Sequence, residues 1–481
     1  MKEAKAAAYL AIQRPKGEQS SAFAIGDENF TAEVIRGWRA DPPRDTFPPV
    51  PEPASADFTH LSALTDALAR AVDFGLSQYE LIAVSSITPS LFEGMVARER
   101  VLRPISEIAE LVSEDDFAAL YRLTEDQYLD LIKKRQELQS LVAGVAALPK
   151  ATLMSIVATF DTIVVDIVSK MLQLGSVEWL GKSERVLPLS RLAAAETIEE
   201  LIRESISDEM YQFSRFSHDE QAKFIETTFG VAIKKYWKRW PDYIEVFERR
   251  NLVAHGEVAF NKRYVEICRN AGHKGADKTL GNQVELSAGY LNQACDVLLE
   301  FAILLPFSLW RKVAKDKENQ AFQNLGEAAF KLIAARRFKP AERVLEFALG
   351  LEKTNIDLET RQRLAVNRAS ALRHDGQEDK ARDLLDSIDW SASSDLFKLC
   401  VASVRGDSDK VAELLPLVKA AGAMDARSFE EWPCFRFVIE DAGVRSAFEK
   451  VFGTSMKEAG TTERLEAAAD ENNPVALDTL H

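Results

Sequence analysis

The stretch PKATLMSIVATFDTIVVDIVSKMLQLG, residues 149–175, decides the fold class of this chain. From Leu153 to Leu174 its apolar side chains recur at spacings of three and four residues, the pattern of a long and largely buried helix. Pro149 is tolerated in a first helical turn, and Gly175 is a frequent helix terminator. We therefore predict a long helix over 153–174 and a domain boundary near residue 148.

The same spacing continues on both sides of this helix. Toward the N-terminus, the spacing of three and four residues is found at Leu61, Leu64, Leu68 and Val72. No clear alternation of apolar and polar residues, which would indicate a strand, occurs there. Further helices are predicted over residues 190–213, 219–229, 241–253 and 287–313. The predicted fold class is therefore all-α, with several helical bundles.

Length and charge restrict the class of protein. A chain of 481 residues exceeds the roughly 250 to 300 residues that one core serves, so several domains are expected. The formal charge of −15 argues against a general nucleic-acid or membrane coat, because phosphate binding requires clustered Lys and Arg. Any contact with RNA must then be local.

Cysteine usage indicates a reducing compartment, and hydropathy predicts no membrane segment. The four cysteines are scattered without a Cys-x-x-Cys pair, which fits neither a disulfide framework nor a zinc site. The longest apolar run, around 301–310, contains Pro306 and is shorter than the roughly 20 residues that span a bilayer. No phosphate-binding loop or dinucleotide fingerprint occurs. We expect a cytoplasmic protein without a membrane segment, a metal or a cofactor.

Six prolines between residues 41 and 53 indicate a linker, because proline removes backbone donors and favours extended chain. The predicted order is a flexible arm with this Pro-rich linker at 1–56, an N-terminal helical domain at 57–148, a central helical domain at 149–314, helical repeats at 315–460 and an acidic tail at 461–481.

The repeats are predicted from a weak internal similarity. The segment AERVL that begins at Ala341 recurs as ARDLL at Ala381 and more faintly as VAELL at Val411, with Gly376 and Gly406 each five residues upstream of a copy. A small residue at a helix crossing after a turn glycine resembles tetratricopeptide (TPR) hairpins, although spacings of 40 and 30 residues depart from that family's period. TPR-like hairpins would present a groove for a protein or peptide, and an irregular bundle is the alternative.

The hexapeptide RNLVAH, residues 250–255, carries the sharpest chemical signal. Arg250 supplies a permanent cation with a planar donor fork suited to phosphate, and His255 supplies a ring that exchanges protons near neutral pH. Together they suit RNA cleavage without a metal. Five helical residues turn by about 500°, which leaves the two side chains roughly 140° apart. Either the helix breaks near Gly256, or two copies pool their residues across a symmetric dimer.

The motif resembles the signature of the HEPN superfamily of helical ribonucleases, with Arg250, Asn251 and His255 at the matching positions. A basic-Tyr element at 262–264, a glycine-bearing loop and the segment LSAGY at 286–290 are similar to one branch of that family. The resemblance covers about 149–305. It implies metal-independent transesterification at a homodimer interface that leaves a 2',3'-cyclic phosphate. His255 would transfer protons, Arg250 would stabilise the phosphate, and Asn251 would orient them.

A basic cluster surrounds the motif in this acidic chain and predicts local RNA binding. Its members besides Arg250 are Lys234, Lys235, Lys238, Arg239, Arg249, Lys262 and Arg263. Tyr236, Trp237, Trp240 and Tyr243 are interleaved with these charges and could stack on unpaired bases, but packing in the core is the favoured interpretation for most of them.

Two other groups of polar residues receive a structural interpretation. His218, Asp219 and Glu220 are adjacent, so they point in different directions on a helix, and the two acids suit a first turn. Asp161 and Asp166 could reach the motif from the same predicted domain, although exposure or structural pairing is favoured.

Two classes of function remain. The leading hypothesis is an endoribonuclease regulated by its flanking domains, similar to toxin or anti-phage defence effectors. The alternative is a non-catalytic dimerisation scaffold, in which the HEPN-like helices pair two chains and the repeats bind a protein partner. A helix-terminal Arg paired with a carboxylate and a His stabilised by the helix dipole would suffice for the scaffold.

Overall fold

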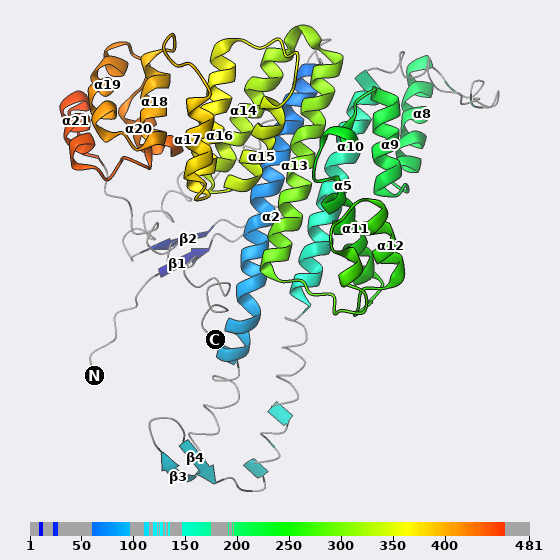
Figure 1. Ribbon diagram of the computed structural model, residues 1–481. Helices are drawn as coiled ribbons and strands as arrows, with labels where there is room; N and C mark the ends of the chain where they lie inside the picture. The colour runs from blue at the N-terminus through cyan, green and yellow to red at the C-terminus, as the bar shows by residue number, and fades with distance from the viewer. Residues whose placement is uncertain are drawn as a thin grey trace. The chain divides into compact units, whose positions relative to one another are not determined.

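The computed structural model of the chain is mostly helical, which confirms the all-α fold class (Figure 1). The chain divides into two compact units, residues 1–58 and 59–481, and each is treated by itself. The structure describes residues 9–12, 23–26, 60–96, 110–114, 119–122, 124, 126, 127, 130, 133, 134, 147–174, 191, 195 and 197–456. The predicted acidic tail at 461–481 lies outside these residues.

The described helices of the second unit fall into two successive groups. Those that build the first part are α2 (His60–Val96), α5 (Leu148–Leu174), α8 (Ile198–Phe213), α9 (His218–Phe229), α10 (Ile233–Tyr236), α11 (Trp240–Ala254), α12 (Lys262–Asn270) and α13 (Ala288–Val313). Those that follow are α14 (Glu318–Ala334), α15 (Phe338–Leu349), α16 (Leu358–His374), α17 (Glu378–Asp386), α18 (Asp395–Arg405), α19 (Ser408–Ala420), α20 (Ala426–Glu431) and α21 (Ala442–Phe452).

Local signals account for many of the helix ends. Ser217 and Glu220 form a capping box at the start of α9, which confirms Glu220 as a first-turn acid, and Gly230 ends this helix with a φ of 67°. Ser287 caps α13 by accepting a hydrogen bond from the Tyr290 N–H. α5 begins at Leu148 with Pro149 in its first turn, as the sequence predicts.

Two short β-hairpins among the described residues are an exception to the predicted all-α fold class. β1 (Tyr9–Ile12) pairs antiparallel with β2 (Phe23–Gly26) in the first unit. β3 (Glu110–Glu114) pairs antiparallel with β4 (Ala119–Arg122) within the predicted helical domain at 57–148. Strands of four or five residues are too short for a period of two to be distinguished from a helical pattern.

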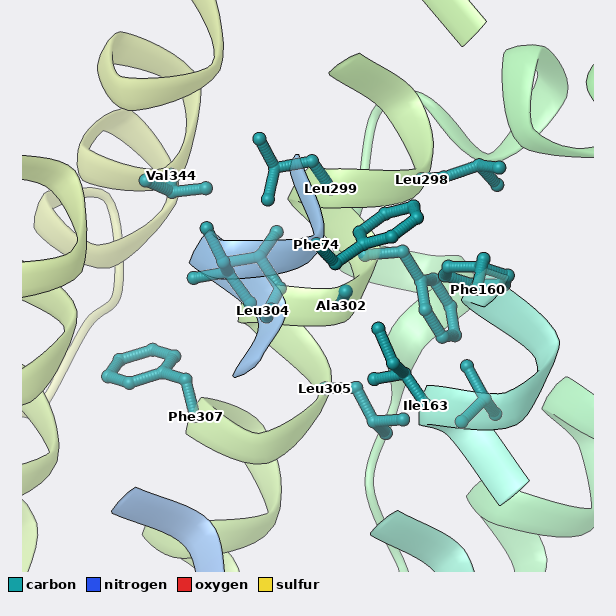
Figure 2. Packing of buried hydrophobic residues seen from close by; sticks show 14 of the residues in the cluster. Phe74, Phe160, Ile163, Leu298, Leu299, Ala302, Leu304, Leu305, Phe307 and Val344 are labelled. Atoms are coloured by element: carbon teal, nitrogen blue, oxygen red, sulfur yellow. The ribbon is translucent and has the colours of Figure 1, made fainter. Parts of the chain in front are cut away.

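Three long helices form the centre of the second unit. α2 packs along α13 and against α5, and Figure 1 shows these helices side by side. Phe74 of α2, Phe160 of α5 and Leu299 of α13 meet in the core shown in Figure 2. A Cβ atom added at Gly75 would lie 2.6 Å from Leu299 Cδ2, so this glycine permits the close approach of α2 and α13.

The hydrophobic cores divide the chain at different places from the predicted domains. One cluster of buried side chains includes residues of α2, α5, α11 and α13 and continues through α14 and α15 into α16. A second cluster extends from α16 to α21. The predicted boundaries at 148 and 314 therefore do not separate cores, because α2 is buried against α5 and α13, and α14 and α15 pack against α13. Periodicity identifies a buried face but does not identify the helix that covers it.

Two helices, α5 and α13, are long and apolar enough to cross a bilayer by length and composition alone. Core helices of soluble proteins commonly satisfy the same criterion, so the finding is weak evidence for a membrane. Most of the apolar window of α13 and half of that of α5 are buried against the rest of the protein. Packing in the three-helix core accounts for the composition of α13.

Three successive helix pairs occupy most of the predicted repeat region. They are α14 with α15, α16 with α17, and α18 with α19, and each second helix begins after a short turn. Ala341, Ala381 and Val411, the three aligned positions, are all buried. Five residues before each of these three positions, one turn residue has a left-handed backbone conformation. Its φ is 59° at Arg336, 76° at Gly376 and 78° at Gly406. The first pair therefore has an arginine where the other two have the turn glycine.

Replacing Gly376 by alanine should lower the free energy of unfolding by about 1–2 kcal/mol, the cost of a left-handed conformation for a residue with a Cβ. No atom lies within 4 Å of the added Cβ, so the cost belongs to the backbone. Gly289→Ala, in the first turn of α13 and without a positive φ, should instead raise the free energy by about 0.5–1 kcal/mol. Chemical denaturation measures both variants, and effects of the same sign would contradict this explanation.

Candidate functional site at the end of helix α11

The predicted motif lies at the C-terminal end of α11. Pro241 opens this helix, and Tyr243 and Phe247 on its buried face belong to the main core. His255 is the C-cap, and Gly256 leaves the helix with a φ of 72°. The helix therefore ends next to Gly256, which is the first of the two arrangements that the sequence predicts for this motif.

Arg250 and His255 have different surroundings within one chain. Arg250 is half-buried, interacts electrostatically with His218 and Glu248, and its Nε is buried without a hydrogen-bond partner in the described residues. The His255 side chain is exposed. Among the described residues, no hydrogen bond or ion pair joins Arg250 to His255. Pooling of these groups across a dimer stays a prediction.

The Asn251 side chain contacts a carboxylate rather than Arg250 or His255. Its Nδ2 donates to Glu248 Oε1 at 3.3 Å. Burial raises the pKa of Glu248, while Arg263, Asn251 and Arg250 lower it. The end of α11 therefore carries a half-buried acid beside the motif arginine, which is a combination found at many proton-transfer sites. No motif in the sequence singled out Glu248.

A second polar pair lies next to Arg250. His218, in the first turn of α9, has its Nε2 2.9 Å from Asp161 Oδ1 on α5. The imidazole stacks on Phe247, with ring centroids 3.2 Å apart. Burial lowers the pKa of His218, Asp161 opposes this shift, and Arg250 adds to it. The residues are 57 positions apart in the sequence, so no local spacing could have predicted this pair.

Lowering the pH below about 6.5 should destabilise the protein partly through His218. Its folded pKa lies below the unfolded value of 6.5, so stability present above that pH is lost as the pH falls toward the folded pKa. One such group contributes at most about 1.4 kcal/mol per pH unit. His218→Gln should remove this slope in denaturation experiments between pH 5 and 7.

The difference in pH slope between His218→Gln and the wild type separates the contribution of His218 from that of other titrating groups. Burial also lowers the pKa of His374, and burial raises the pKa of Glu300 to about 7, which gives the opposite pH dependence. Identical pH slopes for the wild type and His218→Gln would exclude the assignment.

The structure divides the predicted basic cluster into two groups. Arg239 pairs with Asp242 and buried Glu300, Arg249 with buried Glu245, and Lys234 with Asp219. These three cations pair with carboxylates of the same chain, and their predicted contact with RNA stays a prediction. The exposed members are Lys235, Lys238, Lys262 and Arg263, of which Lys238 lies 3.4 Å from Glu346.

The interleaved aromatic residues are mainly structural. Trp237, Trp240 and Tyr243 are buried, which confirms the packing interpretation for these three. Tyr236 is 55% exposed and lies beneath the Lys235 ammonium, 5.1 Å from its ring centroid. Only Tyr236 of the four keeps a ring face for a ligand.

The two downstream elements of the resemblance converge on one buried carboxylate. The Tyr264 hydroxyl donates to Glu245 Oε1 at 2.7 Å, and the Tyr290 hydroxyl donates to Oε2 at 3.1 Å. Arg249 Nε donates to Oε1 at 2.7 Å, and its guanidinium lies 3.7 Å from the Tyr290 ring centroid. This network ties α11 to α12 and α13, and it therefore positions the end of α11.

No group of three His, Cys, Asp or Glu side chains in the described part of the chain is arranged to hold a metal ion. The four cysteines are buried thiols. The chemical groups available around the motif are thus the imidazoles, carboxylates and guanidinium groups already described.

Comparisons with protein-family models, with curated proteins and with solved structures find no match to this chain.

Proposed function

We propose that this protein is a metal-independent endoribonuclease of the HEPN type, with its site at the C-terminal end of α11. The observation that supports this proposal is the end of that helix, where an exposed His255 follows a half-buried Arg250. Their separation of five positions corresponds to a rise of about 7.5 Å along the helix. Exposed Lys262 and Arg263 begin the next helix and supply positive charge nearby.

The reaction would be an intramolecular transesterification. The 2'-hydroxyl attacks the adjacent phosphorus, the bond from phosphorus to the 5'-oxygen breaks, and the products carry a 2',3'-cyclic phosphate and a 5'-hydroxyl. One imidazole accepts the proton of the 2'-hydroxyl and another delivers a proton to the departing 5'-oxygen. The Arg250 guanidinium stabilises the charge on the phosphorane.

Two imidazoles would come from a homodimer. A two-fold axis near the end of α11 would place His255 and Arg250 of both chains around one RNA phosphate. In this assembly Asn251 holds Glu248 beside Arg250 rather than contacting RNA directly. Of the seven flanking cations, exposed Lys262 and Arg263 are proposed to contact RNA at this site, whereas Lys235 and Lys238 lie before the other end of α11.

The experiment is incubation of purified protein with total RNA in EDTA, followed by analysis of the fragment ends. Cleavage that survives chelation and leaves cyclic phosphates supports the proposal. Complete absence of cleavage by a dimeric protein, with and without cell extract as a source of activator, would count against it.

A second candidate function is a dimerisation scaffold that binds a protein partner. The three helix pairs are proposed to be TPR-like hairpins, and their first helices α14, α16 and α18 line a pocket of about 950 Å³. Apolar groups dominate this pocket, including Phe330, Val366 and Phe397. Such a groove suits the apolar side chains of a peptide. Under either function we propose a cytoplasmic protein, and the nuclease would resemble toxin or anti-phage defence effectors.

A further inference from the structure

A cavity of about 800 Å³ lies between the start of α11 and the helix pairs. Its walls come from the turn between α10 and α11, from α13, and from α15, α16 and α17. This volume falls within the range of pockets that enclose a small organic ligand. The cavity is separate from the motif at the opposite end of α11.

The side chains that line this cavity include more cations than carboxylates, although the protein as a whole carries −15. The lining contains two carboxylates, Glu300 and Glu346, and five cationic side chains: Lys238, Arg239, Arg343, Arg361 and Arg368. Carboxylates just outside the lining, Glu342, Asp242 and Asp296, pair with Arg368, Arg239 and Arg343. The positive charge that a ligand would meet is therefore that of Arg361 and Lys238.

One buried carboxylate orients two of the arginines. Glu300 is 1% exposed, and its Oε1 accepts hydrogen bonds from Arg239 Nη1 and Arg343 Nη1, both at 2.8 Å. Arg239 Nε also lies 2.9 Å from Asp242 Oδ2, and Arg343 Nη1 lies 3.7 Å from Asp296 Oδ2, so carboxylates offset the charge of both guanidinium groups. Their positions are therefore set before any ligand arrives, which lowers the entropy cost of binding.

Arg361 and Lys238 are the cations most available to a ligand. Arg361 has no carboxylate at ion-pair distance among the described residues, and its Nη2 donates to Thr354 Oγ1 at 3.2 Å. The Lys238 side chain is 80% exposed, and its ammonium lies 3.4 Å from Glu346. Both can turn toward an anion without leaving a buried acid unpaired.

Aromatic rings complete the wall. Tyr236, which is 55% exposed, and the half-buried Phe347 line the same cavity. We propose that this cavity binds a nucleotide, with the phosphates on Arg361 and Lys238 and the base against these rings. Guanidinium groups form charge-assisted hydrogen bonds with phosphate, and aromatic faces accept any base by stacking. A bounded cavity of this volume suits a mononucleotide or dinucleotide rather than an RNA strand.

The proposal does not depend on nuclease activity. Full-length protein freed of co-purified nucleotide is titrated by calorimetry with ATP, AMP, adenosine and tripolyphosphate. ATP should bind, whereas adenosine, which lacks phosphate, and tripolyphosphate, which lacks a base, should each bind at least about tenfold more weakly. No ATP binding at millimolar concentration would overturn the proposal, and so would equal affinity for tripolyphosphate.

Variants locate the binding. Arg361→Gln and Lys238→Gln should each weaken ATP binding by about tenfold or more, with no change in the melting temperature. Arg363→Gln is the matched control, since Arg363 lies two residues along α16, pairs with Glu359 and lines the other pocket. Unchanged ATP affinity in Arg361→Gln would reject the cavity as the binding site. Tighter binding of a single-stranded RNA oligomer than of ATP, lost in Arg361→Gln, would instead assign the cavity to nucleic acid.

Discussion

Glu245→Ala should lower the free energy of unfolding by about 3–5 kcal/mol, because removing one partner of a buried ion pair leaves an uncompensated charge. The carboxylate is 4% exposed and accepts hydrogen bonds from Arg249, Tyr264 and Tyr290. Its loss leaves one guanidinium and two hydroxyl groups without their acceptor. Burial is the largest cause of the raised pKa of Tyr264 and Tyr290 and does not depend on Glu245, so neither hydroxyl ionises in the variant to neutralise Arg249.

Glu248→Ala is the matched control in chemical denaturation. Glu248 lies three residues along the same helix, is half-buried and accepts one hydrogen bond, from Asn251. Its removal should cost about 1 kcal/mol or less. Tyr264→Phe and Tyr290→Phe should each cost about 1–2 kcal/mol and be non-additive with Glu245→Ala. A Glu245→Ala variant as stable as Glu248→Ala would show that the network contributes little.

His255→Ala should reduce RNA cleavage by about 10²- to 10⁴-fold, the usual contribution of a positioned proton-transfer group. The free energy of unfolding should change by less than about 0.5 kcal/mol, because the side chain is exposed at the helix end. Arg250→Lys keeps the charge but loses the planar donor fork, so it should also lower the cleavage rate while preserving the dimer. Initial rates on a defined RNA, with sedimentation for the oligomeric state, measure these effects.

His218→Gln separates the two imidazoles. Because His218 is buried against Phe247 and bonded to Asp161, its loss should act on stability and on the pH slope rather than directly on the chemical step. Cleavage per folded molecule should therefore remain within severalfold of wild type. Full activity of His255→Ala, together with an inactive but folded His218→Gln, would move the proposed site to the His218–Asp161 pair.

Most of the helices could be predicted because their signals are local. The periodicity of residues 153–174, the proline at 149 and the cap at Ser287 operate within a few residues of the helix that they define. The same holds for the aligned positions Ala341, Ala381 and Val411, which the structure buries. The short hairpins β1–β2 and β3–β4 were missed, because four or five residues carry too little pattern.

From the sequence alone follow the all-α fold class and the positions of α5, α9, α11 and α13, whereas the chemical role of the hexapeptide at 250–255 stays a prediction. Only the tertiary structure decided which partners those residues meet. It placed α2 in the core with α5 and α13, it paired His218 with Asp161, and it directed Arg249 and Arg239 to buried carboxylates. The reason is that helix formation and capping depend on neighbours three or four residues away, whereas burial and charge pairing depend on helices far apart in the chain.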